Sequence, residues 1–307
     1  MSTWLITHTD CLHHDTGSGH PERIERLEAI LSALDTPDYS GLQRHEAIRA
    51  PRAALERAHD ADYIDTVMAS VPTTGRSQLN ADTALSPGSG EAALRAAGAA
   101  IQAVDAIQGG EARRVFCAVR PPGHHAEPAE SMGFCLFSNA AIAALHAQTV
   151  HGIQRVAVVD FDVHHGNGTQ AVLSGREGFF YLSAHQYPLF PGSGSRKENR
   201  PGNILNIPLP EGTGSADYRE QFHREAISAL IDFDPELLII SAGFDAAIED
   251  PLAGLALTTD DFAWITDELI AVANYCCGGH ICSILEGGYD LDALARGVAA
   301  HVDGLMK

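Results

Sequence analysis

Short apolar runs alternate with longer segments of helical periodicity along almost the whole chain. The apolar runs predict strands near residues 3–8, 114–119, 155–161, 179–184, 203–207, 236–241 and 281–285. The periodic segments predict helices near residues 21–34, 89–108, 137–150, 215–232, 259–275 and 291–305. Strands that alternate with helices through short loops indicate a parallel sheet covered on both faces. We therefore expect an α/β fold with a central parallel sheet flanked by helices, in one domain over residues 1–307.

The composition narrows the class of protein. With 307 residues, of which 45% are hydrophobic, the chain can bury one large core. No stretch is long and apolar enough for a membrane span, and the N-terminus lacks a basic segment followed by an apolar core. Six cysteines without zinc-finger spacing are typical of a reducing compartment, so we expect a cytoplasmic protein with no membrane partner. The net charge of −20 argues against direct nucleic-acid binding, which requires a basic surface.

The segment from Asp160 to Gly168 carries the densest candidate chemistry. It follows the apolar run 156–159, and side chains two apart on a strand share a face, so Asp162 and His164 point the same way at the strand end. Catalytic zinc commonly takes three protein ligands and leaves a fourth position for water. Asp245 follows another apolar run, 237–240, and is the candidate third ligand, because ligands collect at the carboxyl ends of parallel strands. The alternative is that all three are ordinary polar residues where strands reach the surface.

Two further segments suggest the reaction. In the segment 120–126, two prolines and a glycine fix a loop from which His124 and His125 project, and a histidine near a metal site can transfer protons at neutral pH. Tyr289 follows two glycines after the predicted strand 281–285, and its hydroxyl could donate a hydrogen bond to a developing oxyanion. Taken singly, a histidine pair can be surface polarity and such a tyrosine a packing residue. Asp250, which precedes a proline, is interpreted as a turn residue.

Together these motifs resemble the histone deacetylase and acetylpolyamine amidohydrolase family of the arginase-deacetylase superfamily, closer to the class II deacetylases and their bacterial relatives. The resemblance extends in the family's order over almost the whole chain. Its motifs are His20-Pro21-Glu22-Arg23, Pro121 to Ala126, Gly133-Phe134-Cys135, Asp160 to Gly168, Phe190-Pro191-Gly192, Gly243-Phe244-Asp245 and Glu286 to Tyr289.

The resemblance implies a role for each residue of the core site. Asp162, His164 and Asp245 would bind one Zn²⁺, and the two hard carboxylates are also compatible with Fe²⁺. His125 would act as general base and then general acid, while His124 would act electrostatically or share the proton transfer. Tyr289 would stabilise the oxyanion. Asp160 matches the residue that orients His124, and Asn167 the one that orients His125; an amide at the second position is a class II feature.

The resemblance also implies two peripheral sites. A structural K⁺ ion would take the Asp160 carboxylate, the Ser183 hydroxyl and the backbone carbonyls of Asp162, His164 and Ala184. The alternative for Asp160 and Ser183 is an ordinary buried hydrogen-bond pair. The substrate channel would be lined by four residues, of which Leu252 forms the rim: Gly133, Phe134, Phe190 and Leu252. The alternative for these side chains is core packing. Arg23 would serve the internal channel for released acetate, or else be a solvated residue of the first helical turn.

The resemblance also bears on the number of metal ions and on the class of substrate. Dimanganese enzymes of the superfamily need carboxylates where this chain has Gly166 and Ala247, so we expect one metal per active site. Polyamine-specific animal enzymes carry an acidic rim residue that we align with Gly254, and no long insertion appears near the N-terminus, so we expect an open site. The expected function is the zinc-dependent removal of an acetyl or other acyl group from an amine, either acetyl-lysine or an acetylated polyamine. A hydrolase of another small amide and a catalytically silent scaffold are the alternatives. The sequence leaves open whether the protein forms a homo-oligomer.

Overall fold

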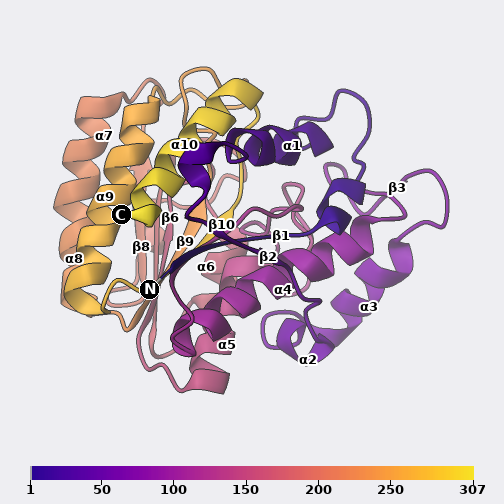
Figure 1. The fold of residues 1–307 in the computed structure, drawn as a ribbon, viewed down its shortest axis with the longest axis horizontal. Helices are drawn as coiled ribbons and strands as arrows, with labels where there is room; N and C mark the ends of the chain where they lie inside the picture. Colours follow the sequence, from indigo (N-terminus) through magenta and orange to yellow (C-terminus); the bar gives the residue numbers. More distant parts are fainter. Residues whose placement is uncertain (1) are drawn as a thin grey trace.

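Eight parallel strands form the centre of the molecule in the computed structural model, which describes residues 2–307 (Figure 1). Their order across the sheet is β2-β1-β5-β10-β9-β6-β7-β8, and every neighbouring pair is parallel. The strands are β1 Ser2–Thr7, β2 Gln43–Glu46, β5 Ala112–Cys117, β6 Val156–Asp160, β7 Phe179–Gln186, β8 Ile204–Leu209, β9 Leu237–Ala242 and β10 Ile281–Leu285. The predicted α/β fold with a central parallel sheet is therefore confirmed.

Helices cover the sheet from opposite sides. On one side α4 packs on β1, β5 and β10, and α5 packs on β6 and β9; on the other side α10 contacts β1 and β5 and joins α1 and α9 (Figure 1). The bounds of these helices are α1 Ile24–Ala33, α4 Ser89–Gln108, α5 Asn139–His151, α9 Thr259–Cys276 and α10 Leu291–Met306. Because helices cover both faces, the central strands β6 and β9 are buried at every residue, which explains their continuous apolar runs.

The remaining elements are shorter or irregular. The predicted helix near 215–232 is continuous but changes from α7 Ser215–Gln221 through a π-helical turn, Phe222–Ile227, to α8 Ser228–Phe233. Further short elements are α2 Arg52–Leu55, α3 Ala61–Ser70, α6 Asn167–Leu173, the strands β3 Ser77–Gln78 and β4 Ala84–Leu85, and three 3₁₀ turns, Thr9–His13, Pro37–Tyr39 and Arg196–Glu198. Within residues 2–307, no helix combines the length and apolar character needed to cross a membrane.

Two predicted boundaries were wrong in ways that affect the site. The strand ends at Asp160, one residue before the expected end, and the strand period that was expected to align Asp162 and His164 does not extend to them, because both lie in the loop that follows β6. The helix expected from residue 21 begins at Ile24, because Arg23 adopts an extended conformation with φ −139° and ψ 164°. The motif His20-Pro21-Glu22-Arg23, which precedes this helix, therefore lies in a loop.

Candidate metal centre and active site

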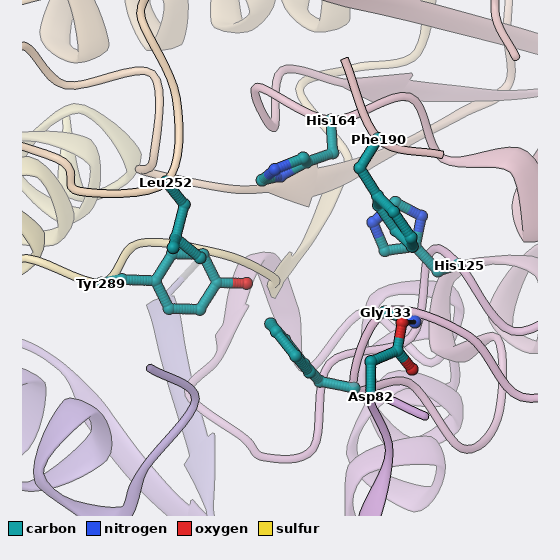
Figure 2. Close-up of a pocket in the computed structure, with 8 residues that line it drawn as sticks. Asp82, His125, Gly133, His164, Phe190, Leu252 and Tyr289 are labelled. Atoms are coloured by element: carbon teal, nitrogen blue, oxygen red, sulfur yellow. Dashed lines mark hydrogen bonds between the residues drawn. The ribbon is translucent and has the colours of Figure 1, made fainter. Parts of the chain in front are cut away.

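A cavity of about 270 Å³ opens beyond the carboxyl ends of the central strands (Figure 2). Four neighbouring strands, β5, β10, β9 and β6, are followed by the loops that carry His125, Tyr289, Asp245 and His164. Residues that are up to 164 positions apart in sequence (125 to 289) therefore lie together at the carboxyl ends of the strands. The lining residues are Asp82, His125, Gly133, Phe134, His164, Phe190, Leu252 and Tyr289.

The three predicted metal ligands meet at the base of this cavity. Nδ1 of His164 lies 3.2 Å from Oδ1 of Asp162 and 3.1 Å from Oδ2 of Asp245. One ring nitrogen carries at most one proton, so it cannot satisfy both carboxylates by hydrogen bonding. All three residues are buried, and ligand atoms from the three lie within 4.8 Å of one another. Two carboxylates and an imidazole nitrogen around a shared point fit a divalent cation such as Zn²⁺.

Backbone amides fix the two carboxylates in this arrangement. Gly287 N–H donates to Oδ2 of Asp162 over 2.8 Å, and Val163 N–H donates to Oδ1 of Asp245 over 2.9 Å. A Cβ atom on Gly287 would overlap both carboxylates, so only glycine allows the chain to pass this close. Burial and the charge of Asp162 raise the pKa of Asp245 to about 7. A cation between the carboxylates would relieve this repulsion.

The predicted histidine pair lies beside the ligands, and each ring has its expected orienting partner. Nδ1 of His124 is 3.0 Å from Oδ2 of Asp160, while Nδ1 of His125 is 2.8 Å from Oδ1 of Asn167. The amide oxygen of Asn167 only accepts, so Nδ1 of His125 carries the proton and its Nε2 keeps a free lone pair. Asn167 in turn donates from Nδ2 to Oε1 of Glu127 over 2.8 Å.

The two histidines differ in charge because their surroundings differ. Burial lowers the pKa of His124, but the Asp162 and Asp160 carboxylates outweigh burial and hold that pKa well above the usual value. Within residues 2–307, the His125 ring has no carboxylate partner, and its Nδ1 pairs with the Asn167 amide. Burial, followed by the nearby His124 and His164, lowers the pKa of His125 well below the usual value. One ring is therefore suited to remain cationic and the other to accept a proton.

The Asp160 carboxylate accepts more hydrogen bonds than the sequence predicts. Besides His124, its Oδ2 accepts a hydrogen bond from the Tyr181 hydroxyl at 3.0 Å, and its Oδ1 accepts from Asp162 N–H at 3.1 Å. A Cβ atom on Gly166 would overlap the Asp160 carboxylate and the Tyr181 hydroxyl and lie 3.1 Å from Nδ1 of His124. The position where dimanganese enzymes need a further carboxylate therefore has no room for one.

The residues of the predicted K⁺ site lie side by side, but they do not form the hydrogen bond that was the alternative. Asp160 and Ser183 are register partners on β6 and β7. Within residues 2–307, the Ser183 hydroxyl pairs with Nδ1 of His185 at 2.8 Å instead of with Asp160. Ala184 is buried beside them. The K⁺ site stays a prediction.

The backbone of Tyr289 is fixed by hydrogen bonding, and its hydroxyl points into the cavity (Figure 2). Its backbone N–H donates to Oδ2 of Asp250 over 2.7 Å, and Leu252 N–H donates to Oδ1 of the same carboxylate over 2.9 Å. Asp250 therefore stabilises a turn, as the sequence indicates, and also positions Tyr289, which the sequence does not indicate. Burial, with the charge of Asp245 next, raises the pKa of Tyr289 well above its usual value, so its hydroxyl stays protonated as a donor.

The arginine beside the site is Arg26, whereas the family resemblance selected Arg23. Arg26 is fully buried, donates to the carbonyls of Gly288 and Glu286, and lies with its guanidinium 5.0 Å from the Tyr289 ring centre. Nε of Arg23 is buried and makes no hydrogen bond within the described part of the chain. The missed signal is the helical spacing: Arg26 stands on the same buried face of α1 as Leu27 and Ile30.

The four predicted channel residues all line the cavity. The Phe190 ring is 5.1 Å from the His125 ring, and the Phe134 ring is 6.0 Å from the Tyr289 ring. Phe190 is 42% exposed and Leu252 36% exposed, which places them at a rim rather than in the core. Gly133 has φ +53°, and a Cβ atom there would overlap the His125 ring.

Two features of the rim differ from expectation. Leu252 faces the cavity as predicted, but Gly254, which we aligned with the acidic rim residue, does not line it: the Gly254 N–H donates to Gln186, and an added Cβ would lie 2.6 Å from Cγ of Glu211. Asp82 was missed: its Oδ2 accepts from Gly133 N–H over 3.2 Å, and the carboxylate lines the cavity (Figure 2). Asp82 lies in the Gly-, Pro- and Ser-rich loop from Pro72 to Ser89, which the sequence indicates as part of the rim, but no motif selects this residue within the loop.

Known proteins similar to this chain match it over nearly its whole length. The family model of the histone deacetylase domain matches residues 20–305. A histone deacetylase-like amidohydrolase of Pseudomonas aeruginosa is 40% identical over 278 aligned residues, covering 89% of this chain and 73% of that protein. The Homo sapiens polyamine deacetylase HDAC10 is 36% identical over 327 aligned residues, covering 100% of this chain and 48% of that protein. The crystal structure of the HDA15 HD domain matches with a TM-score of 0.93 and 34% identity, covering 99% of this chain and 88% of that chain.

Proposed function

The chain belongs to the histone deacetylase family and is a hydrolase, and from that premise we propose that it removes an acetyl group from an acylated amine with one bound metal ion. The observation that carries this proposal is the convergence of three candidate metal ligands and two differently charged histidines at one cavity, which His125, His164 and Tyr289 line. Zn²⁺ suits the ligand set of Asp162, His164 and Asp245, and Fe²⁺ is compatible with it.

The proposed role of each residue follows from the protonation states of the two histidines and the tyrosine. The metal, when bound, supplies a Lewis acid for the amide carbonyl and for a water molecule. His125, with its free Nε2, takes a proton from the attacking water and passes it to the departing amine. His124, kept cationic by Asp160 and Asp162, stabilises negative charge nearby. The protonated Tyr289 hydroxyl donates to the carbonyl oxygen as negative charge develops there. One water and one amide give a carboxylic acid and an amine, so the protons balance.

The shape of the cavity favours an extended aliphatic amine as the substrate. Phe134 and Phe190 provide apolar walls for a methylene chain, and Leu252 adds an apolar side chain at the mouth. The mouth is open, with no carboxylate at the position of Leu252 to select a second ammonium group; the carboxylate that does line the cavity, Asp82, accepts a hydrogen bond from Gly133 N–H. We therefore propose that acetyl-lysine in a peptide is accepted at least as well as an acetylated polyamine. The K⁺ site at Asp160 and Ser183 and a cytoplasmic location are part of the same proposal.

The test compares acetate release from an acetyl-lysine peptide, acetylputrescine and acetylspermidine by the zinc-loaded protein. Asp245→Asn, which removes one ligand charge, is the matched control and should release no acetate from any of them. A large preference for the acetylated polyamines would overturn the open site. Failure to hydrolyse all three with metal bound would instead favour a catalytically silent scaffold.

A further inference from the structure

A second cluster of possible metal ligands lies between α4 and α5, away from the active site. It consists of Asp105 on α4 and of His146 and His151 on α5. Nε2 of His146 is 2.6 Å and Nε2 of His151 is 2.7 Å from the same oxygen, Oδ1 of Asp105. Ligand atoms from the three residues lie within 4.8 Å of one another. The mechanism proposed above uses none of these residues.

We propose that this cluster binds a divalent transition-metal ion, with Zn²⁺ as the best match, and thereby joins α4 to α5. Two imidazole nitrogens and a carboxylate oxygen are ligands that Zn²⁺ accepts, and such an ion would replace the two hydrogen bonds that now share one oxygen. His146 is 9% exposed and fixes one side of the site. His151 is 24% exposed and Asp105 45% exposed, so water can fill the remaining position and an ion can enter.

The ends of two helices add to the attraction for a cation. Asp105 lies in the last turn of α4, which ends at Gln108, and His151 is the last residue of α5. Both C-terminal ends therefore meet at this cluster, and the unpaired carbonyl groups of a helix C-terminus carry partial negative charge. Two converging C-termini and one carboxylate give the cluster a negative potential, although no second carboxylate takes part.

One positive group opposes binding. Nη1 of Arg57 lies 3.1 Å from Nδ1 of His146. A neutral imidazole that binds a metal through Nε2 carries its proton on Nδ1, so it can no longer accept from Arg57. The guanidinium must move aside when the ion binds. Replacing Arg57 by glutamine should therefore strengthen binding, by roughly fivefold for loss of about 1 kcal/mol of opposing charge at a partly exposed position.

The cluster is separate from the catalytic centre. His151 precedes the first residue of β6, Val156, whereas Asp160 at the other end of β6 belongs to the active site. Four residue steps along a strand span about 13 Å. A metal at the cluster would therefore lie at the opposite edge of the sheet and would not form a dinuclear site with the catalytic metal.

The experiment counts Zn²⁺ ions in protein that already holds its active-site metal. Equilibrium dialysis against Zn²⁺ followed by metal analysis should give two ions per chain for the natural protein and one for His151→Gln and for Asp105→Asn. The matched control is His223→Gln, because His223 also pairs with a carboxylate, Glu268, at 2.7 Å; this variant should keep two ions. Acetate release should be unchanged in all three variants, which separates failure of this site from failure of the proposed function.

Two results would overturn the proposal. One is a single bound ion in the natural protein, which would make the cluster an ordinary group of Asp–His hydrogen bonds. The other is a second ion that persists in both His151→Gln and Asp105→Asn, which would place it elsewhere. Since both substitutions keep roughly the size of the original side chains, circular dichroism should show folded variants. The melting temperature of the natural protein should rise with Zn²⁺, while that of these two variants should not.

Discussion

Replacing Tyr289 by phenylalanine isolates one hydroxyl group with little effect on the fold. The backbone N–H of residue 289 would still donate to Asp250, and the ring would keep its place 5.0 Å from the Arg26 guanidinium and 6.0 Å from the Phe134 ring. Figure 2 shows the hydroxyl directed into the cavity, with no hydrogen bond to the other residues drawn. The substitution therefore removes a donor that acts only when a substrate is present.

The expected loss of rate follows from that geometry. Removing one donor from an oxyanion site typically lowers kcat by about 10² to 10³, equivalent to about 2.7–4 kcal/mol of transition-state stabilisation. Because the hydroxyl acts on charge that appears only during the reaction, KM should change much less than kcat. The metal ligands are untouched, so metal content should stay the same.

The assay is steady-state acetate release from an acetyl-lysine peptide, together with metal analysis and thermal unfolding of the same preparations. Tyr275→Phe is the control, because this tyrosine is 77% exposed and does not line the cavity. Tyr289 is not the oxyanion donor if Tyr289→Phe turns over at a rate within a few-fold of the natural protein. This role is also refuted if the loss of rate is accompanied by loss of metal, since the damage would then lie in the fold.

Three further predictions test other parts of the account. Asp250→Asn loses one of two charge-assisted contacts, worth about 1.5–3 kcal/mol, so kcat should fall by about 10- to 100-fold with metal retained; an unchanged kcat would remove Asp250 from the positioning of Tyr289. Leu252→Glu puts a carboxylate at the rim and should raise kcat/KM for acetylspermidine relative to an acetyl-lysine peptide by about fivefold, the value of about 1 kcal/mol for an exposed ion pair; an unchanged ratio would mean that this rim does not meet the distal amine. The free energy of unfolding should fall as the pH drops below about 6.5. In the folded protein, burial lowers the pKa of five histidines to about 3 or 4: His14, His59, His165, His185 and His301. In the unfolded chain the same histidines take up protons near their ordinary pKa of about 6.5. Each contributes about 2 kcal/mol of destabilisation at pH 5, so urea unfolding at several pH values should give a steep slope between pH 6.5 and 5, and a slope of less than one proton would contradict the burial argument.

The fold was predictable wherever a strand or helix carries its own signal. Strands β6 and β9 are buried on both faces, so their apolar runs identify them without knowledge of neighbours. Strand β2 has no such run: it is an edge strand with the sequence Gln43–Glu46, and only pairing with β1 makes it a strand. The short helix α6 begins at Asn167 inside a glycine-containing segment, which local propensity assigns to a loop.

The site was predictable to a similar degree and for a similar reason. Asp162, His164 and Asp245 follow buried strands, and parallel strands bring their carboxyl ends to one edge, so the structure brings together the three residues that the sequence selected. Asp82 and Asp250 act on the site from loops, and Arg26 acts from helix α1, each through contacts with segments far apart in sequence. Arg26 shares the buried face of α1 with Leu27 and Ile30, which is a local signal, whereas no local pattern distinguishes Asp82 and Asp250 from surface or turn residues. Their positions depend on which loops meet, and that is a property of the whole fold.

A metal titration of the apo-protein, with acetate release as the readout, tests metal-dependent deacetylation most directly. His151→Gln is the best background, because it removes the second proposed metal site and leaves the cavity unchanged. We expect no acetate release from an acetyl-lysine peptide without metal, and release that rises with added Zn²⁺ and levels off at one equivalent per chain. Full release from metal-free protein, or a requirement for a second equivalent, would contradict this expectation.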